Sequence, residues 1–154
     1  MRLEIPDTEK RLLVTVETDR CAVDAIQAIT GCRPGKRTLR LLDYGKLAAT
    51  FFDQTEDVAI RVAARGDLRD RVDQLQAGDG DGHEAERRAY LELSDEDLFV
   101  FRSVEPAYGE FDLPGSPRKR TKCRHCGEEV SDGREVRTDD GDLCRPCATV
   151  AGLR

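Results

Sequence analysis

Short runs of β-branched and aromatic residues alternate with segments of helical periodicity along the first two thirds of the chain. Runs of this kind bounded by glycine, proline or aspartate predict strands, whereas apolar positions spaced three or four residues apart predict helices. The pattern predicts strands over residues 11–18, 38–42, 47–52, 58–63 and 99–104. It predicts helices over residues 21–29, 67–77 and 84–93, with one further helical turn that begins at Ser94.

The first predicted helix has the clearest boundary signals. Asp19 is a suitable N-cap, and Gly31 stands where a left-handed C-cap is expected. The apolar side chains that share one face of this helix are Val23, Ile26 and Ile29. Together with the strand runs, this helix predicts an α+β core in which a small, mostly antiparallel sheet packs against helices.

Prolines and glycines between Pro106 and Pro117 separate this core from the end of the chain. Such punctuation is typical of a linker. We therefore predict a core over residues 1–112, a linker over 113–122 and a small module over 123–154.

The last module contains two C-x2-C pairs separated by seventeen residues, formed by Cys123, Cys126, Cys144 and Cys147. Each pair can place two thiolates on one tight turn, a knuckle, and two facing knuckles make a cage of four sulfurs. Zn2+ fits that cage best, at about 2.3 Å per Zn–S bond, with iron or a pair of disulfides as alternatives. Because four protein ligands leave no position for a substrate water, we predict one structural zinc per chain.

The residues around the pairs fit this interpretation. Gly127 and Pro146 are suited to closing the two knuckles. Residues 134–143 predict a hairpin with its turn at Asp140–Gly141, and residues 148–151 predict the start of a short helix after Cys147. A knuckle, a hairpin and a second knuckle leading into a helix indicate a treble-clef or zinc-ribbon-like module.

Composition narrows the setting and the partners. No apolar run is long enough to span a bilayer and Met1–Glu4 does not open a signal peptide, so we expect a reducing cytoplasm. The net charge of −6 argues against a general nucleic-acid binder. The basic run over residues 118–124 contains no aromatic residue for stacking on bases, so a solvated linker or a contact with the protein's own acidic residues is favoured over nucleic acid.

Two cysteines lie outside the module, at either end of the first predicted helix. Cys21, in its first turn, is either a thiolate ligand or redox thiol activated by the helix dipole, or a small apolar residue packed where helix meets sheet. Cys32 lies eleven residues further on, which corresponds to roughly 15 Å along a helix. A disulfide requires Cα atoms within about 7 Å, so we predict a helix stop with a buried thiol at Cys32.

The tetrapeptide Asp43-Tyr44-Gly45-Lys46 has two interpretations. It places a carboxylate, a phenol and an ammonium in one bend, which suits binding of a polar ligand or proton transfer. Alternatively, it is a hairpin turn in which Gly45 supplies a positive φ. Lys46 is therefore kept with Cys21 as a candidate catalytic residue.

Four motifs between Val16 and Phe52 recur in the same order and spacing in a known family: Glu17-Thr18-Asp19-Arg20-Cys21-Ala22-Val23-Asp24-Ala25-Ile26-Gln27, Thr30-Gly31-Cys32, Gly35-Lys36 and Asp43-Tyr44-Gly45-Lys46. The chain resembles the FmdE family, the FmdE subunits of molybdenum or tungsten formylmethanofuran dehydrogenases, which also ends in paired C-x2-C motifs. Family members typically begin with a His-Gly-His-x-Cys-Pro-Gly segment and a helix, which this sequence lacks. The resemblance therefore implies a shortened member whose open face is covered by a second copy or another protein.

Three functions follow from these observations. The first is a zinc-binding accessory or subunit-like protein that acts through protein contacts and has no turnover of its own. The second is a thiol- or metal-dependent enzyme that uses Cys21, with Lys46, in a core pocket. The third and weakest is a nucleic-acid-binding regulator that acts through the zinc module.

Overall fold

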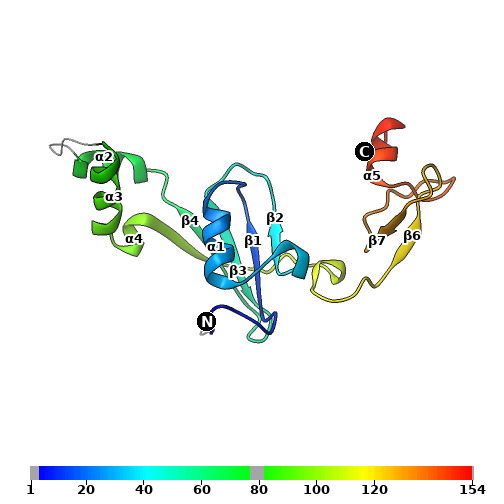
Figure 1. The fold of residues 1–154 in the computed structure, drawn as a ribbon, viewed down its shortest axis with the longest axis horizontal. Helices are drawn as coiled ribbons and strands as arrows, with labels where there is room; N and C mark the ends of the chain where they lie inside the picture. Colours follow the sequence, from blue (N-terminus) through cyan, green and yellow to red (C-terminus); the bar gives the residue numbers. More distant parts are fainter. Residues whose placement is uncertain (1–3, 77–81, 154) are drawn as a thin grey trace. The chain divides into compact units, whose positions relative to one another are not determined.

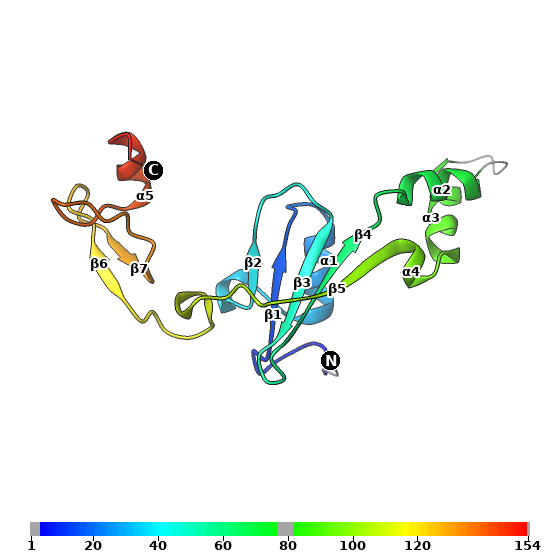
Figure 2. The same ribbon diagram turned by 180° about the vertical axis from the view of Figure 1, so that it is seen from behind.

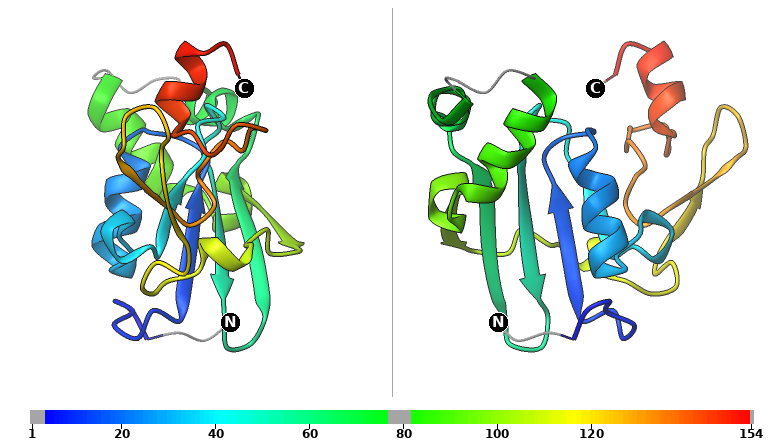
Figure 3. Two further views of the ribbon diagram at one scale, coloured as in Figure 1. Left: turned by 90° about the vertical axis from the view of Figure 1, so that its right-hand side faces the viewer. Right: turned by 60° about the vertical axis from the view of Figure 1, so that its left-hand side comes forward.

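Strand β1 (Leu12–Val16) has a neighbouring strand on each side in the sheet that organises the first part of the chain. It pairs in parallel with β2 (Leu39–Leu41) and antiparallel with β3 (Ala48–Asp53). On one edge Val14 lies opposite Leu39, and on the other it lies opposite Phe51. The strand connects to β2 through helix α1 (Ala22–Thr30), which runs along one face of the sheet (Figure 3).

Strands β4 (Val58–Ala64) and β5 (Phe99–Val104) extend the sheet antiparallel to the order β2-β1-β3-β4-β5 (Figure 1). This computed structural model describes residues 4–76 and 82–153. It divides the chain into two units, Met1–Pro106 and Ala107–Arg154. The predicted α+β class with a mostly antiparallel sheet is confirmed.

The side chains of β1 are buried on both faces of the sheet. Leu12, Leu13, Val14 and Val16 are each at most 2% exposed. Val14 and its neighbours on one face pack with Val23 and Ile26 of α1. On the opposite face, the strand register places Leu13 beside Phe52. This burial explains why the strand reads as a nearly continuous apolar run.

The start of α1 differs from the prediction, whereas its end agrees. Cys21, not Asp19, occupies the N-cap position, and no side chain caps the helix there. Gly31 adopts the left-handed conformation at φ +73°, as expected of a C-cap. A Cβ added to Gly31 would lie 3.0 Å from the Cβ of Pro6, so a larger residue meets a neighbour as well as backbone strain.

The Asp43–Lys46 connection is not a hairpin turn, because β1 lies between β2 and β3. The connection crosses the end of β1, where the N–H groups of Tyr44 and Lys46 both donate to the carbonyl of Glu17, at 3.3 and 2.9 Å. Gly45 has a φ of +63°, so the expected left-handed residue is present. The hairpin interpretation was wrong because a turn signal specifies the bend and not the strand that follows it.

Three helices lie between β4 and β5: α2 (Leu68–Gln76), α3 (Gly82–Glu92) and α4 (Asp95–Leu98). The predicted helices over 67–77 and 84–93 are confirmed, and the expected break at Gly78–Gly82 lies mostly outside the described residues. Ser94 caps α4, since its hydroxyl accepts a hydrogen bond from the N–H of Asp97 at 3.2 Å. Among the described residues, the helices are all too short or too polar to cross a membrane.

Two ion pairs join the central strands at opposite ends. Arg11 donates to both carboxylate oxygens of the fully buried Asp53, at 2.7 and 2.6 Å. Arg61 donates to both oxygens of Glu17 at 2.6 and 2.7 Å. The hydrogen bond from Arg11 lowers the pKa of Asp53 below its ordinary value of 3.8, and the one from Arg61 lowers the pKa of Glu17.

We expect Asp53→Asn to lower the free energy of unfolding by about 2 kcal/mol at neutral pH, because it removes a charged acceptor from a buried pair. The folded-state pKa of Asp53 is depressed, so its contribution is present above the unfolded value and is lost as the pH falls through the folded pKa. Urea denaturation at neutral pH and near about pH 3 measures the difference, which should shrink in acid. Glu56→Gln, at a largely exposed side chain, is the control and should change stability little. An Asp53→Asn effect as small as this control would contradict the assignment.

Candidate metal centre

The first cysteine pair lies in a turn between two short strands. β6 (Arg120–Lys122) and β7 (Glu129–Ser131) pair antiparallel, and Cys123 and Cys126 occupy the connection (Figure 2). The N–H of Gly127, at φ +76°, donates to the carbonyl of Cys123 at 2.8 Å. The sequence predicted this closing glycine but not the flanking strands, which are only three residues long.

The second pair begins helix α5 (Arg145–Val150). Cys144 is its N-cap and Pro146 lies in its first turn, where a missing N–H has no cost. Cys147 therefore lies inside the helix, whereas the sequence predicted a helix that started after it. The prediction placed the start too late because Pro146 also suits the first turn of a helix.

A hairpin connects the two pairs, as predicted. The backbones of Val136 and Leu143 exchange two hydrogen bonds, at 2.8 and 2.9 Å. The turn closes where the N–H of Gly141 donates to Thr138 at 3.1 Å. The hairpin also holds the first knuckle, because the carbonyl of Asp142 accepts from the N–H of Arg124 at 2.9 Å.

The two knuckles bring the four cysteine sulfurs together. All four sulfur atoms lie within 4.8 Å of one another, and those of Cys126 and Cys144 are 3.9 Å apart. A tetrahedral site with Zn–S bonds of about 2.3 Å has sulfurs about 3.8 Å apart. Across residues 4–76 and 82–153, no second group of three or more His, Cys, Asp or Glu side chains is close enough to hold a metal.

The electrostatics of the cluster favour a bound cation. The backbone N–H groups of Cys126 and Cys144 lower the pKa of Cys123 to about 6. The hydrogen bond with Cys144, together with burial, raises the pKa of Cys147 to about 12. Four adjacent sulfurs cannot all carry negative charge without a counterion, and a divalent cation supplies it. The donor set therefore fits a metal that prefers thiolates.

Little besides the cysteines fills the interior of this unit. Cys123, Leu143 and Ala148 are buried, and Val130 and Val136 pack against them. His125 is exposed, with Nδ1 3.5 Å from the sulfur of Cys147. Three buried side chains are too few to hold a fold, so a metal bound by the sulfurs would be its main source of stability.

The basic run before the first knuckle has acidic partners within the same unit. Its ion pairs join Arg118 to Glu110, Lys119 to Glu135, Arg120 to Glu129 and Arg124 to Asp140. These contacts neutralise most of the charge that a nucleic-acid phosphate would require. They agree with the preference for contacts with the protein's own acidic residues.

The two cysteines of the first unit lie in different environments. Cys32 is 1% exposed, its thiol contacts the carbonyl of Leu12 at 3.4 Å, and burial raises its pKa. Cys21 is exposed at the start of α1. Lys46 is also exposed, with Nζ 5.9 Å from the ring centre of Tyr44. Neither candidate catalytic residue belongs to a metal-ligating cluster of the described residues.

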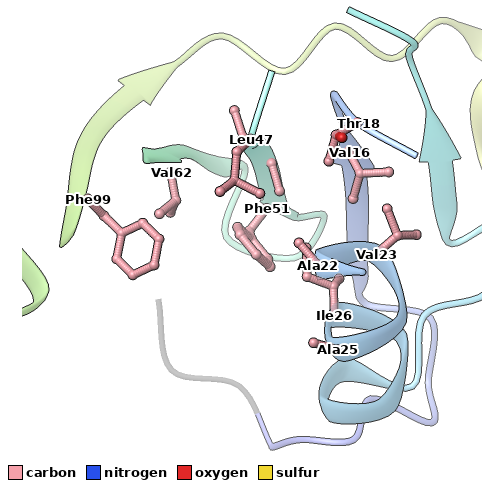
Figure 4. A pocket seen from close by; sticks show the side chains of 12 residues that line it. Val16, Thr18, Ala22, Val23, Ala25, Ile26, Leu47, Phe51, Val62 and Phe99 are labelled. Carbon is pink, nitrogen blue, oxygen red and sulfur yellow. The ribbon is translucent and has the colours of Figure 1, made fainter. Parts of the chain in front are cut away.

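A pocket of about 240 Å³ lies between α1 and the sheet (Figure 4). Its walls come from α1 on one side and from Leu47, Phe51, Val62 and Phe99 on the other (Figure 4). All lining residues are apolar except Thr18, and neither Cys21 nor Lys46 is among them. The sequence analysis missed this pocket because its walls come from residues far apart in the chain.

Comparison with known families identifies the first unit. A family model described as FmdE, molybdenum formylmethanofuran dehydrogenase operon, matches residues 1–100. The chain belongs to the FmdE family. The match ends before the cysteine pairs, so the metal assignment rests on the geometry of this chain's own second unit.

A solved structure supports the same fold for this FmdE chain. It is an FmdE-like protein of the tungsten formylmethanofuran dehydrogenase type from Syntrophus aciditrophicus, with a TM-score of 0.53 and 21% identity. The likeness covers 93% of this chain and 74% of that one. No curated protein matches the sequence.

Removal of the metal should unfold the second unit of this FmdE protein and leave the first intact. The sulfur cluster is the main feature that holds residues 107–154, whereas residues 4–76 and 82–106 have their own sheet and core. Hydrogen–deuterium exchange with and without a strong chelator tests this, and we expect protection to fall only in residues 107–154. Excess zinc should restore it. Loss of protection in both units, or in neither, would contradict the division of roles.

Proposed function

We propose that this FmdE-family protein is a zinc-binding accessory or subunit-like protein that acts through protein contacts and has no turnover of its own. The observation that carries this proposal is the composition of the pocket beside α1. No ionisable or nucleophilic side chain lines it, apart from the hydroxyl of Thr18. Acid–base catalysis requires a titratable group within hydrogen-bond reach of the substrate, whereas binding of an apolar side chain does not.

The pocket suits a protein partner. Leu47 is 51% exposed, although it stands on the same wall as Phe51 and Val62. Apolar side chains around a concavity are typical of the anchor positions at protein interfaces, where one aromatic or aliphatic residue fills a pocket. The partner in this proposal is therefore a protein, either a second copy or a stable hetero-partner.

The metal has a structural role in this proposal. Cys123, Cys126, Cys144 and Cys147 supply four ligands, which completes a tetrahedral zinc site and leaves no position for a reacting water. The thiols must remain reduced to bind the metal, so we place the protein in the cytoplasm. Zinc is preferred to iron because it needs no redox partner and suits four thiolates in a small module.

The resemblance to other FmdE proteins gives the proposal its setting. The similar solved structure is described as FmdE-like, after the FmdE component of a tungsten formylmethanofuran dehydrogenase. We infer a comparable place for this chain, as a non-catalytic component of an assembly in which a different polypeptide carries the chemistry. The cysteine module then serves as a rigid contact surface at the end of the chain.

A second candidate function is a thiol- or metal-dependent enzyme that uses Cys21, with Lys46. One observation favours it: Cys21 is exposed and directly precedes Ala22, which lines the pocket. A thiol in this position would reach a ligand bound beside α1, and the positive end of the helix would stabilise its thiolate. The metal content of a Cys21 variant distinguishes the two functions.

We expect one zinc per chain by elemental mass spectrometry, in the native protein and in Cys21→Ser alike. Cys126→Ser should lose most of its zinc, because three thiolates and an exposed edge hold the metal less tightly. A second metal that disappears in Cys21→Ser would contradict the accessory role and favour the enzyme.

A matched pair of leucines tests the role of the pocket. Leu47 and Leu41 are both 51% exposed, but only Leu47 lines the pocket. We expect Leu47→Asp to reduce the amount of co-purifying protein by about tenfold, because it places a charge in a desolvated contact. Leu41→Asp should have little effect. Quantitative mass spectrometry of tagged full-length protein measures both, and equal recovery from the two variants would contradict a pocket-bound partner.

A further inference from the structure

The two edges of the sheet differ in how well they are protected. β2 is only three residues long, and short edge strands offer little to pair with. β5 has six residues, no proline and a single charged side chain, that of Arg102. Phe101, in the middle of β5, is 50% exposed, and β4 is its only neighbour in the sheet (Figure 2). An apolar edge of this length normally pairs with another strand.

The hydrogen-bonding groups of β5 alternate between the sheet and the free edge. The carbonyl of Leu98 accepts from the N–H of Arg65 at 3.0 Å, on the side of β4. Alternation then directs the backbone of Val100 and Arg102 toward β4, and the backbone of Phe101 and Ser103 outward. Within the part of the chain that the structure describes, the outward N–H and C=O groups of Phe101 and Ser103 make no hydrogen bond.

We propose that β5 pairs antiparallel with β5 of a second copy of this chain, about a two-fold axis at Phe101. Phe101 then exchanges two hydrogen bonds with Phe101 of the second copy. The N–H of Ser103 donates to the carbonyl of Phe99 in the second copy, and the reverse bond forms by symmetry. The N–H of Phe99 is already used, since it donates to the carbonyl of Asp95, so this register uses the groups that are free.

The charge of Arg102 selects this register over its neighbours. A shift that centres the axis on Arg102 places the two guanidinium groups directly opposite each other, which is destabilising. A shift that centres it on Val100 requires the N–H of Phe99, which is occupied. With the axis at Phe101, Arg102 faces Val100 of the second copy and the two charges are offset.

Side-chain contacts support the same arrangement. The rings of Phe99 and Phe101 lie edge to face with centres 6.4 Å apart, on the face of the sheet that carries the pocket. The two-fold axis brings both Phe101 rings together on that face, and aromatic pairs across adjacent strands are stabilising. The pockets of the two copies then lie on the same face of one continuous sheet, on either side of the aromatic pair.

This inference deepens the proposed function and rests on it, because it names one of the protein contacts through which the chain acts. The two are tested separately. A monomeric protein with one zinc per chain and a pocket-bound partner would overturn the strand pairing alone. A dimer that binds a second, Cys21-dependent metal would overturn the accessory role alone.

Two variants of one residue isolate the backbone contact. Ser103→Pro removes the outward N–H without touching the bonds to β4, whereas Ser103→Ala keeps it. Sedimentation equilibrium of the full-length zinc-loaded protein should show a dimer for the native chain and for Ser103→Ala. We expect Ser103→Pro to raise the dimer dissociation constant by at least about tenfold, since two inter-copy bonds are lost. Circular dichroism checks that the variant remains folded.

Phe101→Lys is the second variant, for use if Ser103→Pro does not fold. It places two like charges at the axis and should give a folded monomer. Arg102→Val tests the register and should leave the dissociation constant within about threefold. A native monomer, a Ser103→Pro dimer as tight as Ser103→Ala, or a folded Phe101→Lys dimer would overturn the pairing. Marked tightening of the dimer in Arg102→Val would overturn the register.

Discussion

Strand β1 is buried on both faces and hydrogen-bonded on both edges, and the rest of the first unit is arranged to satisfy that constraint. A buried strand must have every N–H and C=O paired, because unpaired backbone groups away from water are costly. β2 and β3 provide those partners, and α1 covers one face. The connection from β2 to β3 must then cross the end of β1, where the carbonyl of Glu17 accepts from Tyr44 and Lys46.

The sequence predicted most elements of this unit but not the order of its strands. Local signals sufficed for the helix stop at Gly31, the cap at Ser94 and the final strand over 99–104, because each depends on a few adjacent residues. The Asp43–Lys46 bend was ambiguous, since a glycine with positive φ serves a hairpin and a crossover equally well. Strand order depends on contacts between distant residues, and a single sequence records those only indirectly.

The candidate sites divide in the same way. The sulfur cluster was predictable because spacing alone places each cysteine pair on one knuckle, and the hairpin between them is encoded locally. The pocket was not predictable, because Phe51, Val62 and Phe99 come from three strands that meet only in the folded sheet. The position of Cys21 was correctly placed at the start of a helix, but its exposure depends on how α1 lies on the sheet.

The two units meet the same shortage of buried apolar surface by different means. The second unit buries few side chains, and four thiolates around a metal would supply the stability that packing does not. The first unit has a real core at β1, but its sheet ends in an apolar strand with unpaired backbone groups beside an open pocket. Selection against aggregation normally removes such an edge by shortening it or charging it, as the short β2 shows at the other side. An edge that keeps its length and its aromatic residues is therefore best explained by a strand that covers it.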